Sequence, residues 1–201
     1  MSRRALLHTL LWTVTWLRVV LVPVFVWAGS RAQDLGRAGA NASDHRLAVV
    51  AILALIGASD VLDGWIARRF DLASQIGAIV DAGADKLAQV AFIAFFALSR
   101  GPSFQPLPVG YLLVLVGRDL IVAAGWLGLR ARYGPFQVIH RVHGRAATVS
   151  VFALVFWLTL DLPEGGTRAL TLTSSALIVA SGVLYAMDGF ARAPARAPEE
   201  S

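Results

Sequence analysis

The sequence predicts an all-α integral membrane protein with six transmembrane helices. Of its 201 residues, 57% are hydrophobic and only 15% are charged, whereas about a quarter of the residues in a soluble domain are charged. Apolar runs of about 20 residues recur along the chain, and a helix needs this length to cross a bilayer. The sequence contains no cysteine, which excludes disulfide frameworks and thiolate metal sites.

Polar or proline-rich connectors separate the six apolar segments. The first connector, 29–46, is rich in Gly, Ala, Asn and Ser, and the connector 100–108 contains three prolines, which are expected to end one helix and start the next. The composition of 192–201 is typical of disorder, so we expect one transmembrane domain over 1–191 followed by a disordered tail. The expected spans are roughly 6–28, 47–69, 77–99, 107–129, 146–160 and 170–188.

Basic residues predict how this domain is oriented. An even number of spans places both termini on one side of the membrane, together with the connectors near 70–76 and 130–145. Ten arginines lie on that side, at the span ends or beyond them, and five lie on the opposite side; the cytoplasmic side is normally the more basic one. The formal net charge of +5 suits anionic lipid better than nucleic acid. We therefore expect a multi-pass protein of the cytoplasmic membrane with a cytoplasmic tail.

Four aspartates lie in the second and third apolar segments, in the pattern D-x2-D-G-x2-A-R-x8-G-x3-D-x3-D. If both segments are helical, Asp60 and Asp63 share one face, and so do Asp81 and Asp85. A charged carboxylate at the centre of a span costs about 2.5–3.5 kcal/mol, so this group needs compensating cations. Carboxylate oxygens suit Mg²⁺ or Mn²⁺, and two such ions would hold a diphosphate near the cytoplasmic face. Small residues on the same faces would leave room for a bulky ligand: Gly64, Ala67, Gly77 and Ala84.

Three other interpretations of these acids stay open. Each acid could instead pair with an arginine of a neighbouring helix, and the small residues could serve helix packing alone. Acids within spans are also typical of cation transporters and proton relays, although these distribute their acids across the bilayer. In a non-catalytic membrane scaffold the acids would be dispensable. The full set of eight specified residues, all near one face, favours the metal site.

The complete pattern resembles the signature of the CDP-alcohol phosphotransferases, integral membrane enzymes with six helices that make phospholipids. The resemblance implies that the four aspartates bind two Mg²⁺ ions, with Mn²⁺ as the alternative, and that Asp85 is the catalytic base on the acceptor hydroxyl. It also implies a homodimer. The residues implied to contact the CDP moiety are Asp60, Gly64, Ala67, Arg68 and Ser74.

Outside this signature the similarity is looser. Many members carry a Pro-Asn-x-x-Thr-x-x-Arg stretch in the first helix, and the segment 11–18 keeps its Thr and Arg, as Thr15 and Arg18, but lacks its Pro and Asn. Three further segments resemble phosphatidylglycerophosphate and cardiolipin synthases, namely 117–119, 144–148 and 181–185.

A basic cluster predicts an acceptor that carries phosphate. Arg118 lies within a span, where its charge needs an anionic partner, and Asp119 is expected to orient it. Arg141 and Arg145 belong to the loop before the fifth span. These arginines favour glycerol 3-phosphate over a neutral or cationic alcohol. The hypothesis is therefore transfer of a phosphatidyl group from CDP-diacylglycerol to glycerol 3-phosphate with release of CMP. Transfer to phosphatidylglycerol, as in a cardiolipin synthase, is the alternative.

Overall fold

A computed structural model describes residues 3–70, 75–133 and 142–191, and it contains six α-helices and no strand within these ranges. Each expected span overlaps one helix, so the predicted number and order of helices are confirmed. The tail predicted at 192–201 lies outside the described residues. The helices are α1 (Arg3–Arg37), α2 (Ser43–Phe70), α3 (Gln75–Leu98), α4 (Val109–Tyr133), α5 (Val142–Thr159) and α6 (Glu164–Ala191).

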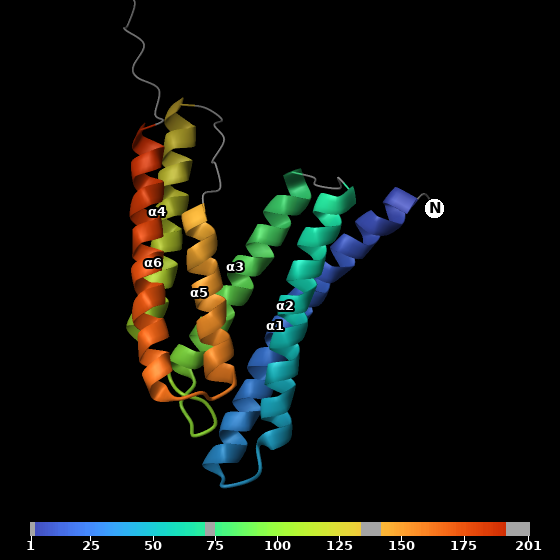
Figure 1. Ribbon diagram of the computed structural model, residues 1–201, viewed down its shortest axis with the longest axis vertical. Coiled ribbons are helices and arrows are strands. Elements are labelled where there is room, and N and C mark those ends of the chain that lie inside the picture. The colour runs from blue at the N-terminus through green and yellow to red at the C-terminus, as the bar shows by residue number, and fades with distance from the viewer. Residues whose placement is uncertain (1–2, 71–74, 134–141, 192–201) are drawn as a thin grey trace, which may run out of the picture.

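The helices form two groups that meet at one end of the molecule and diverge toward the other (Figure 1). In one group α1 packs against α2 and α3, and in the other α6 packs against α4 and α5. Helix α3 also contacts α4 and α5, so it links the two groups. The start of α1, the end of α2, the start of α3 and the end of α6 all lie at the diverging end (Figure 1). This is the distribution expected for an even number of spans.

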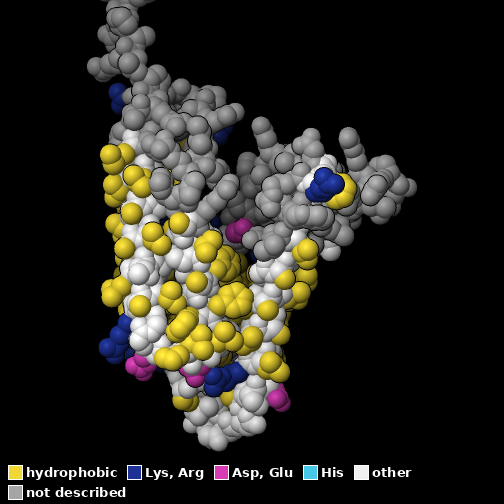
Figure 2. Space-filling view, in the orientation of Figure 1, with side chains coloured by type: hydrophobic (Ala, Val, Ile, Leu, Met, Phe, Trp, Pro, Cys, Tyr) yellow, Lys and Arg dark blue, Asp and Glu magenta, His cyan; other side chains and the backbone are white. Residues whose placement is uncertain are grey.

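The outer surface of the helices is strongly apolar. Within the described residues, two helical segments are long and apolar enough to cross a membrane, Val109–Arg132 in α4 and Glu164–Met187 in α6. Large side chains on both, such as Leu113 and Leu172, are exposed. Figure 2 shows hydrophobic side chains spread over the helices on the face in view. Soluble monomers rarely expose so much contiguous apolar surface, and lipid would cover it. For the remaining helices, membrane spanning stays a prediction.

Helix α1 is longer than the apolar run that predicted it. The sequence predicts a connector over 29–46, and this is wrong for residues 29–37, which continue the helix, and for 43–46, which begin α2. Polar contacts explain the difference, because Gln33 is buried and its Oε1 accepts a hydrogen bond from the backbone N–H of Ser103 at 3.0 Å. Hydropathy does not detect such a contact. The helix ends before Gly39, whose φ of 68° is a conformation that glycine adopts without strain.

Helix α6 also begins earlier than expected, at Glu164 rather than near residue 170. Pro163 precedes it, and the backbone N–H of Gly166 donates to the carbonyl of Pro163 at 3.0 Å; proline is well suited to a helix start because its φ is already helical. In the turn before α6, Asp161 pairs with Arg46 of α2 at 3.0 Å. This ion pair ties the two helix groups together at the end where they meet.

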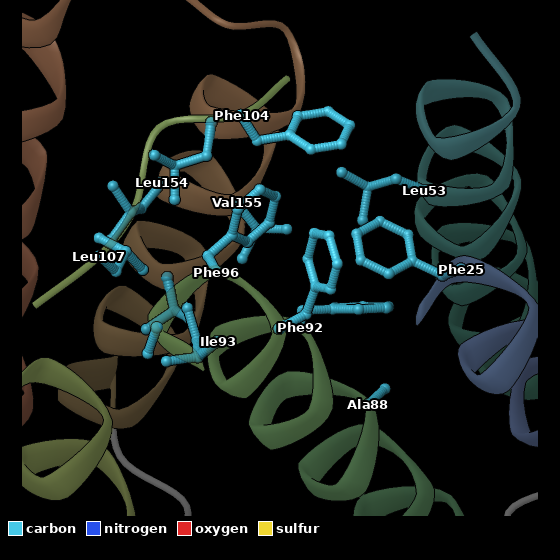
Figure 3. Packing of buried hydrophobic residues seen from close by; sticks show 14 of the residues in the cluster. Phe25, Leu53, Ala88, Phe92, Ile93, Phe96, Phe104, Leu107, Leu154 and Val155 are labelled. Carbon is cyan, nitrogen blue, oxygen red and sulfur yellow. The ribbon is translucent and has the colours of Figure 1, made fainter. Parts of the chain in front are cut away.

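The end where the two helix groups meet is called the closed end. Aromatic side chains from α1, α3 and the connector after α3 fill the core there (Figure 3). The ring centroids of Phe25 and Phe92 lie 4.5 Å apart, and those of Phe96 and Phe104 lie 5.9 Å apart. Such pairs contribute about 0.5–1.5 kcal/mol each beyond the area they bury. Phe92 lies about 10 Å from Asp85 along the axis of α3, since each residue of a helix adds 1.5 Å. The core and the acidic motif therefore occupy different halves of the same helix.

Close packing of α1 on α3 gives a stability prediction. A β-carbon at Gly29 would lie 2.5 Å from the ring of Phe95, so Gly29→Ala is expected to destabilise the protein by about 1–3 kcal/mol. Gly125 in α4 is the matched control, because an added β-carbon meets nothing within 4 Å. Gly125→Ala is expected to be neutral or stabilising by up to about 1 kcal/mol. Thermal unfolding in detergent micelles measures both, and equal melting temperatures for the two variants would contradict this packing.

Candidate active site

The four aspartates of the motif lie on two uninterrupted helices. Asp60 and Asp63 belong to α2, and Asp81 and Asp85 belong to α3. Because both segments are helical, the spacings of three and four residues place the members of each pair on one face, as the sequence predicts. Five Cα–Cα steps separate the end of α2 from the start of α3, so these two helix ends lie within about 18 Å of each other.

Asp85 is the one motif aspartate whose side chain belongs to the described part of the structure. Its Oδ1 accepts a charged hydrogen bond from Nη1 of Arg18, which α1 contributes. Arg18 is 1% exposed, whereas the Asp85 side chain is 37% exposed. The carboxylate is therefore anchored by a fully buried cation and still reaches the surface of the protein. The side chains of Asp60, Asp63 and Asp81 lie outside the described residues.

The contact between Arg18 and Asp85 bears on two sequence interpretations. Pairing of an acid with a neighbouring arginine, the alternative to metal binding, does occur for Asp85. The sequence assigned Arg18 no role beyond its match to the Thr-x-x-Arg of many family members. A cation within an apolar span was the available signal, because such a charge needs a partner. The identity of that partner, 67 positions along the chain, could not be read from the sequence.

A second polar cluster joins α3, α4 and α6 beside Asp85. Nη1 of Arg118 donates to Oδ1 of Asp119 at 2.5 Å, and its Nη2 donates to the hydroxyl of Ser181 at 2.7 Å. The guanidinium also lies over the ring of Tyr185, 5.3 Å from the centroid. Nζ of Lys86 lies 3.0 Å from Oδ2 of Asp119. The prediction that Asp119 orients Arg118 is confirmed, and Lys86 is a partner that the sequence did not indicate.

Two of the segments that resemble synthases, 117–119 and 181–185, meet in this cluster. A β-carbon at Gly182 would lie 3.0 Å from Cγ of Arg118, so the glycine lets α6 approach the stem of the arginine. The cluster is shielded on the α6 side by Ser181, which is buried. Sequence similarity alone did not indicate that these segments touch.

The other predicted site residues are described only in part. Gly64, Ala67 and Arg68 lie in the helical backbone of α2, and Arg145 lies in the first turn of α5, but nothing is described of their side chains. Ser74 and Arg141 lie outside the described residues. Among the side chains that the structure does describe, no three potential metal ligands converge. This does not test the predicted metal site, because the side chains of three of its four predicted ligands are not described.

Comparison with known proteins identifies the family. The model of the CDP-alcohol phosphatidyltransferase family matches residues 10–187. The chain belongs to this family. The match covers the acidic motif, Arg18 and all but the last residues of α6, so the resemblance carried by the aspartate pattern is confirmed over nearly the whole chain.

Individual relatives carry two kinds of name. A CDP-diacylglycerol–glycerol-3-phosphate 3-phosphatidyltransferase of Pseudomonas fluorescens is 29% identical over 183 residues, covering 90% of this chain and 87% of its own. A CMP-forming cardiolipin synthase of Streptomyces coelicolor is 35% identical over 152 residues, covering 75% and 63%. A probable phosphatidylglycerophosphate synthase of Mycobacterium tuberculosis is 34% identical over 133 residues, covering 62% and 61%. These relatives support a place in phospholipid biosynthesis.

The ion pair between Arg18 and Asp85 gives a second stability prediction. Breaking a buried pair costs about 3–5 kcal/mol, and less is expected here because Asp85 is partly exposed. Arg18→Met and Asp85→Asn should each destabilise the protein, and the double variant should lose less than the sum by about 0.5–3 kcal/mol. Unfolding in micelles measures this coupling.

The exposed pair of Arg37 and Asp34, 2.8 Å apart, is the matched control. Its coupling energy should stay below about 0.5 kcal/mol. Additive effects of the Arg18 and Asp85 substitutions would show that the two side chains do not depend on each other.

Proposed function

We propose that the protein transfers a phosphatidyl group from CDP-diacylglycerol to glycerol 3-phosphate and releases CMP. The observation that carries this proposal is the complete aspartate signature on two uninterrupted helices, in a chain whose family is known. The name of the Pseudomonas relative, which aligns with 90% of the chain, supports glycerol 3-phosphate as the acceptor. Family membership also favours a transferase over the cation transporter and the scaffold considered from the sequence.

The donor atoms of the motif suit divalent metal ions. Carboxylate oxygens are the ligands that Mg²⁺ and Mn²⁺ prefer, and Asp85 keeps 37% of its side chain exposed although its partner Arg18 is buried. One of the proposed ligands therefore reaches the surface of the protein, where a charged substrate can approach it. Two Mg²⁺ ions, or Mn²⁺ in their place, held by Asp60, Asp63, Asp81 and Asp85 would offset the charge of the donor diphosphate.

Asp85 is the proposed base. It takes the proton from the acceptor hydroxyl, whose oxygen forms a bond to the β-phosphorus of the donor. The bond from that phosphorus to the bridging oxygen breaks, and CMP leaves with this oxygen. Arg18 holds the carboxylate of Asp85 from α1 and so fixes its orientation. On α2, Gly64 and Ala67 would leave room for the nucleotide, and Arg68 would offer a guanidinium fork to its phosphate.

The proposed setting is the cytoplasmic membrane, with the diverging end of the helices facing the cytoplasm. The apolar outer surface of α4 and α6 supports a membrane location, and the twofold excess of arginines supports this orientation. The lipid tails of the donor would then remain in the bilayer while its nucleotide meets the water-soluble acceptor. Homodimer formation, which the family resemblance implies, stays a prediction.

Replacing the proposed base tests the mechanism. Asp85→Asn should lower the rate of CMP release from CDP-diacylglycerol by about 10²–10⁴-fold, the usual contribution of a general base. The assay uses protein in nanodiscs with Mg²⁺ and glycerol 3-phosphate. Asp34→Asn, at an exposed site in the last turns of α1, is the control and should keep full activity. Undiminished turnover of folded Asp85→Asn protein would remove this residue from the mechanism.

A panel of acceptors tests the choice of substrate. Glycerol 3-phosphate, phosphatidylglycerol, inositol phosphate and serine are supplied separately with the same donor. The highest kcat/KM is expected for glycerol 3-phosphate, and product formation is followed by mass spectrometry of the lipid extract. A preference for phosphatidylglycerol would instead assign the cardiolipin synthase activity that the name of the Streptomyces relative suggests. Neither result would alter the role of Asp85.

A further inference from the structure

The arginine expected to bind the acceptor has most of its guanidinium already engaged. Arg118 donates from Nη1 to Asp119 and from Nη2 to Ser181, and its face lies over Tyr185. Within the described residues only its Nε has no hydrogen-bond partner. The side chain is 15% exposed. Two of its five N–H groups are therefore engaged, its Nε is buried, and this largely covered guanidinium is poorly placed for the usual bidentate contact with a phosphate.

Lys86 is the accessible cation of the same cluster. Its side chain is 43% exposed, and Nζ donates to Oδ1 of Asp119 at 3.2 Å and to Oε1 of Gln89 at 3.1 Å, with Oδ2 of Asp119 at 3.0 Å. An ammonium has three hydrogen-bond donors, so this arrangement leaves capacity for a further acceptor. The long, flexible stem lets the ammonium move toward a ligand without disturbing α3.

Among the side chains that the structure describes, the charges of this cluster do not balance. Lys86 and Arg118 supply two positive charges, and Asp119 supplies one negative charge between them. Asp85, the nearest acid along α3, is engaged by Arg18 from the other side. An excess cation among membrane helices is unfavourable unless an anion or water compensates it. An anionic ligand at Lys86 would complete the cluster.

The position of Lys86 connects this anion site to the proposed base. Lys86 directly follows Asp85, so their Cα atoms lie about 3.8 Å apart. Their side chains point about 100° apart around α3, Asp85 toward α1 and Lys86 toward α4. A small ligand that placed an anionic group at Lys86 could present a hydroxyl a few bonds away to Asp85. Glycerol 3-phosphate has this arrangement, with a three-carbon chain between phosphate and reacting hydroxyl.

We propose that Lys86 binds the phosphate of a water-soluble phosphomonoester acceptor, and that Asp119 is a positioning residue that holds Lys86 and Arg118 side by side. Arg118 contributes charge from a fixed position and does not grip the phosphate. This inference rests on the proposed function and adds a specificity-determining residue to it. It also distinguishes Lys86 from the arginines that the sequence singled out.

Because Lys86 is the only lysine in the sequence, its amine can be followed as a single site. Protein in phosphatidylcholine nanodiscs is reductively methylated, and the peptide that carries Lys86 is quantified by mass spectrometry, with the N-terminal amine as internal reference. Glycerol 3-phosphate should slow methylation of Lys86 several-fold, whereas glycerol should not. Asp119→Asn should speed methylation in the absence of ligand, since the ammonium loses its ion-pair partner. Equal rates with and without glycerol 3-phosphate, at concentrations that support turnover, would overturn the proposal.

Kinetics supply the second readout. Lys86→Gln should raise the KM for glycerol 3-phosphate by about 10-fold or more, the loss expected for one charge-assisted hydrogen bond, with the KM for CDP-diacylglycerol unchanged. Lys86→Arg should restore part of the loss. Arg168→Gln, at an exposed cation of α6 near the closed end, is the control and should change neither constant. An unchanged acceptor KM in Lys86→Gln would overturn the proposal.

Comparing protection of Lys86 with transfer of the phosphatidyl group separates this inference from the proposed function. If glycerol 3-phosphate protects Lys86 but receives no phosphatidyl group, the anion site stands and the proposed reaction fails. If transfer proceeds while Lys86 is not protected, the inference fails and the reaction stands. Nanodiscs that contain phosphatidylglycerol test a lipid phosphodiester in place of the soluble phosphate. Protection by phosphatidylglycerol alone would overturn the assignment of a soluble acceptor.

Discussion

Charged side chains in an apolar helix bundle must be compensated, and this constraint organises the half of the molecule that carries the motif. Isolated charges within membrane helices cost several kcal/mol, and the chain places at least six of them in α1, α3 and α4. Two ion pairs between helices offset part of this charge: Arg18 of α1 holds Asp85 of α3, and Lys86 of α3 meets Asp119 of α4. Ion pairs thus join helices that are far apart in the sequence, and these pairs lie at the proposed active site.

The two ends of the molecule are stabilised by different forces. At the closed end, Phe25, Phe92 and Phe96 pack tightly, and Arg46 with Asp161 closes the outer edge. At the diverging end the helices separate (Figure 1), and α3 passes from the aromatic core into the polar region within two turns. A rigid core at one end lets the helices present charged groups at the other without losing their relative positions. This arrangement suits a site that admits both a lipid and a soluble substrate.

Hydropathy and motif spacing predicted the parts of this structure that depend on local sequence. Six apolar runs gave six helices, and spacings of three and four placed Asp60 with Asp63 and Asp81 with Asp85 on common helix faces. The true start of α6 and the true end of α1 were missed, because Pro163 and the buried Gln33 stabilise helix beyond the apolar run. The partners of Asp85 and Lys86 were missed for a different reason. Each lies in another helix, and no local pattern encodes which helices meet.

Asp85 and Lys86 are adjacent in α3 and carry opposite charges, and they contact different helices, α1 and α4. One helix could therefore serve two parts of a reaction. Asp85 is drawn to Arg18, so its carboxylate is held on the side of α3 that faces α1. Lys86 is drawn to Asp119, so its ammonium is fixed on the side of α4 and α6. The helical rotation of about 100° per residue thereby separates negative from positive ligands while the backbone keeps them within a few ångströms. A metal-bound diphosphate on one side and an anionic acceptor on the other would then meet at α3 without their charges opposing each other directly.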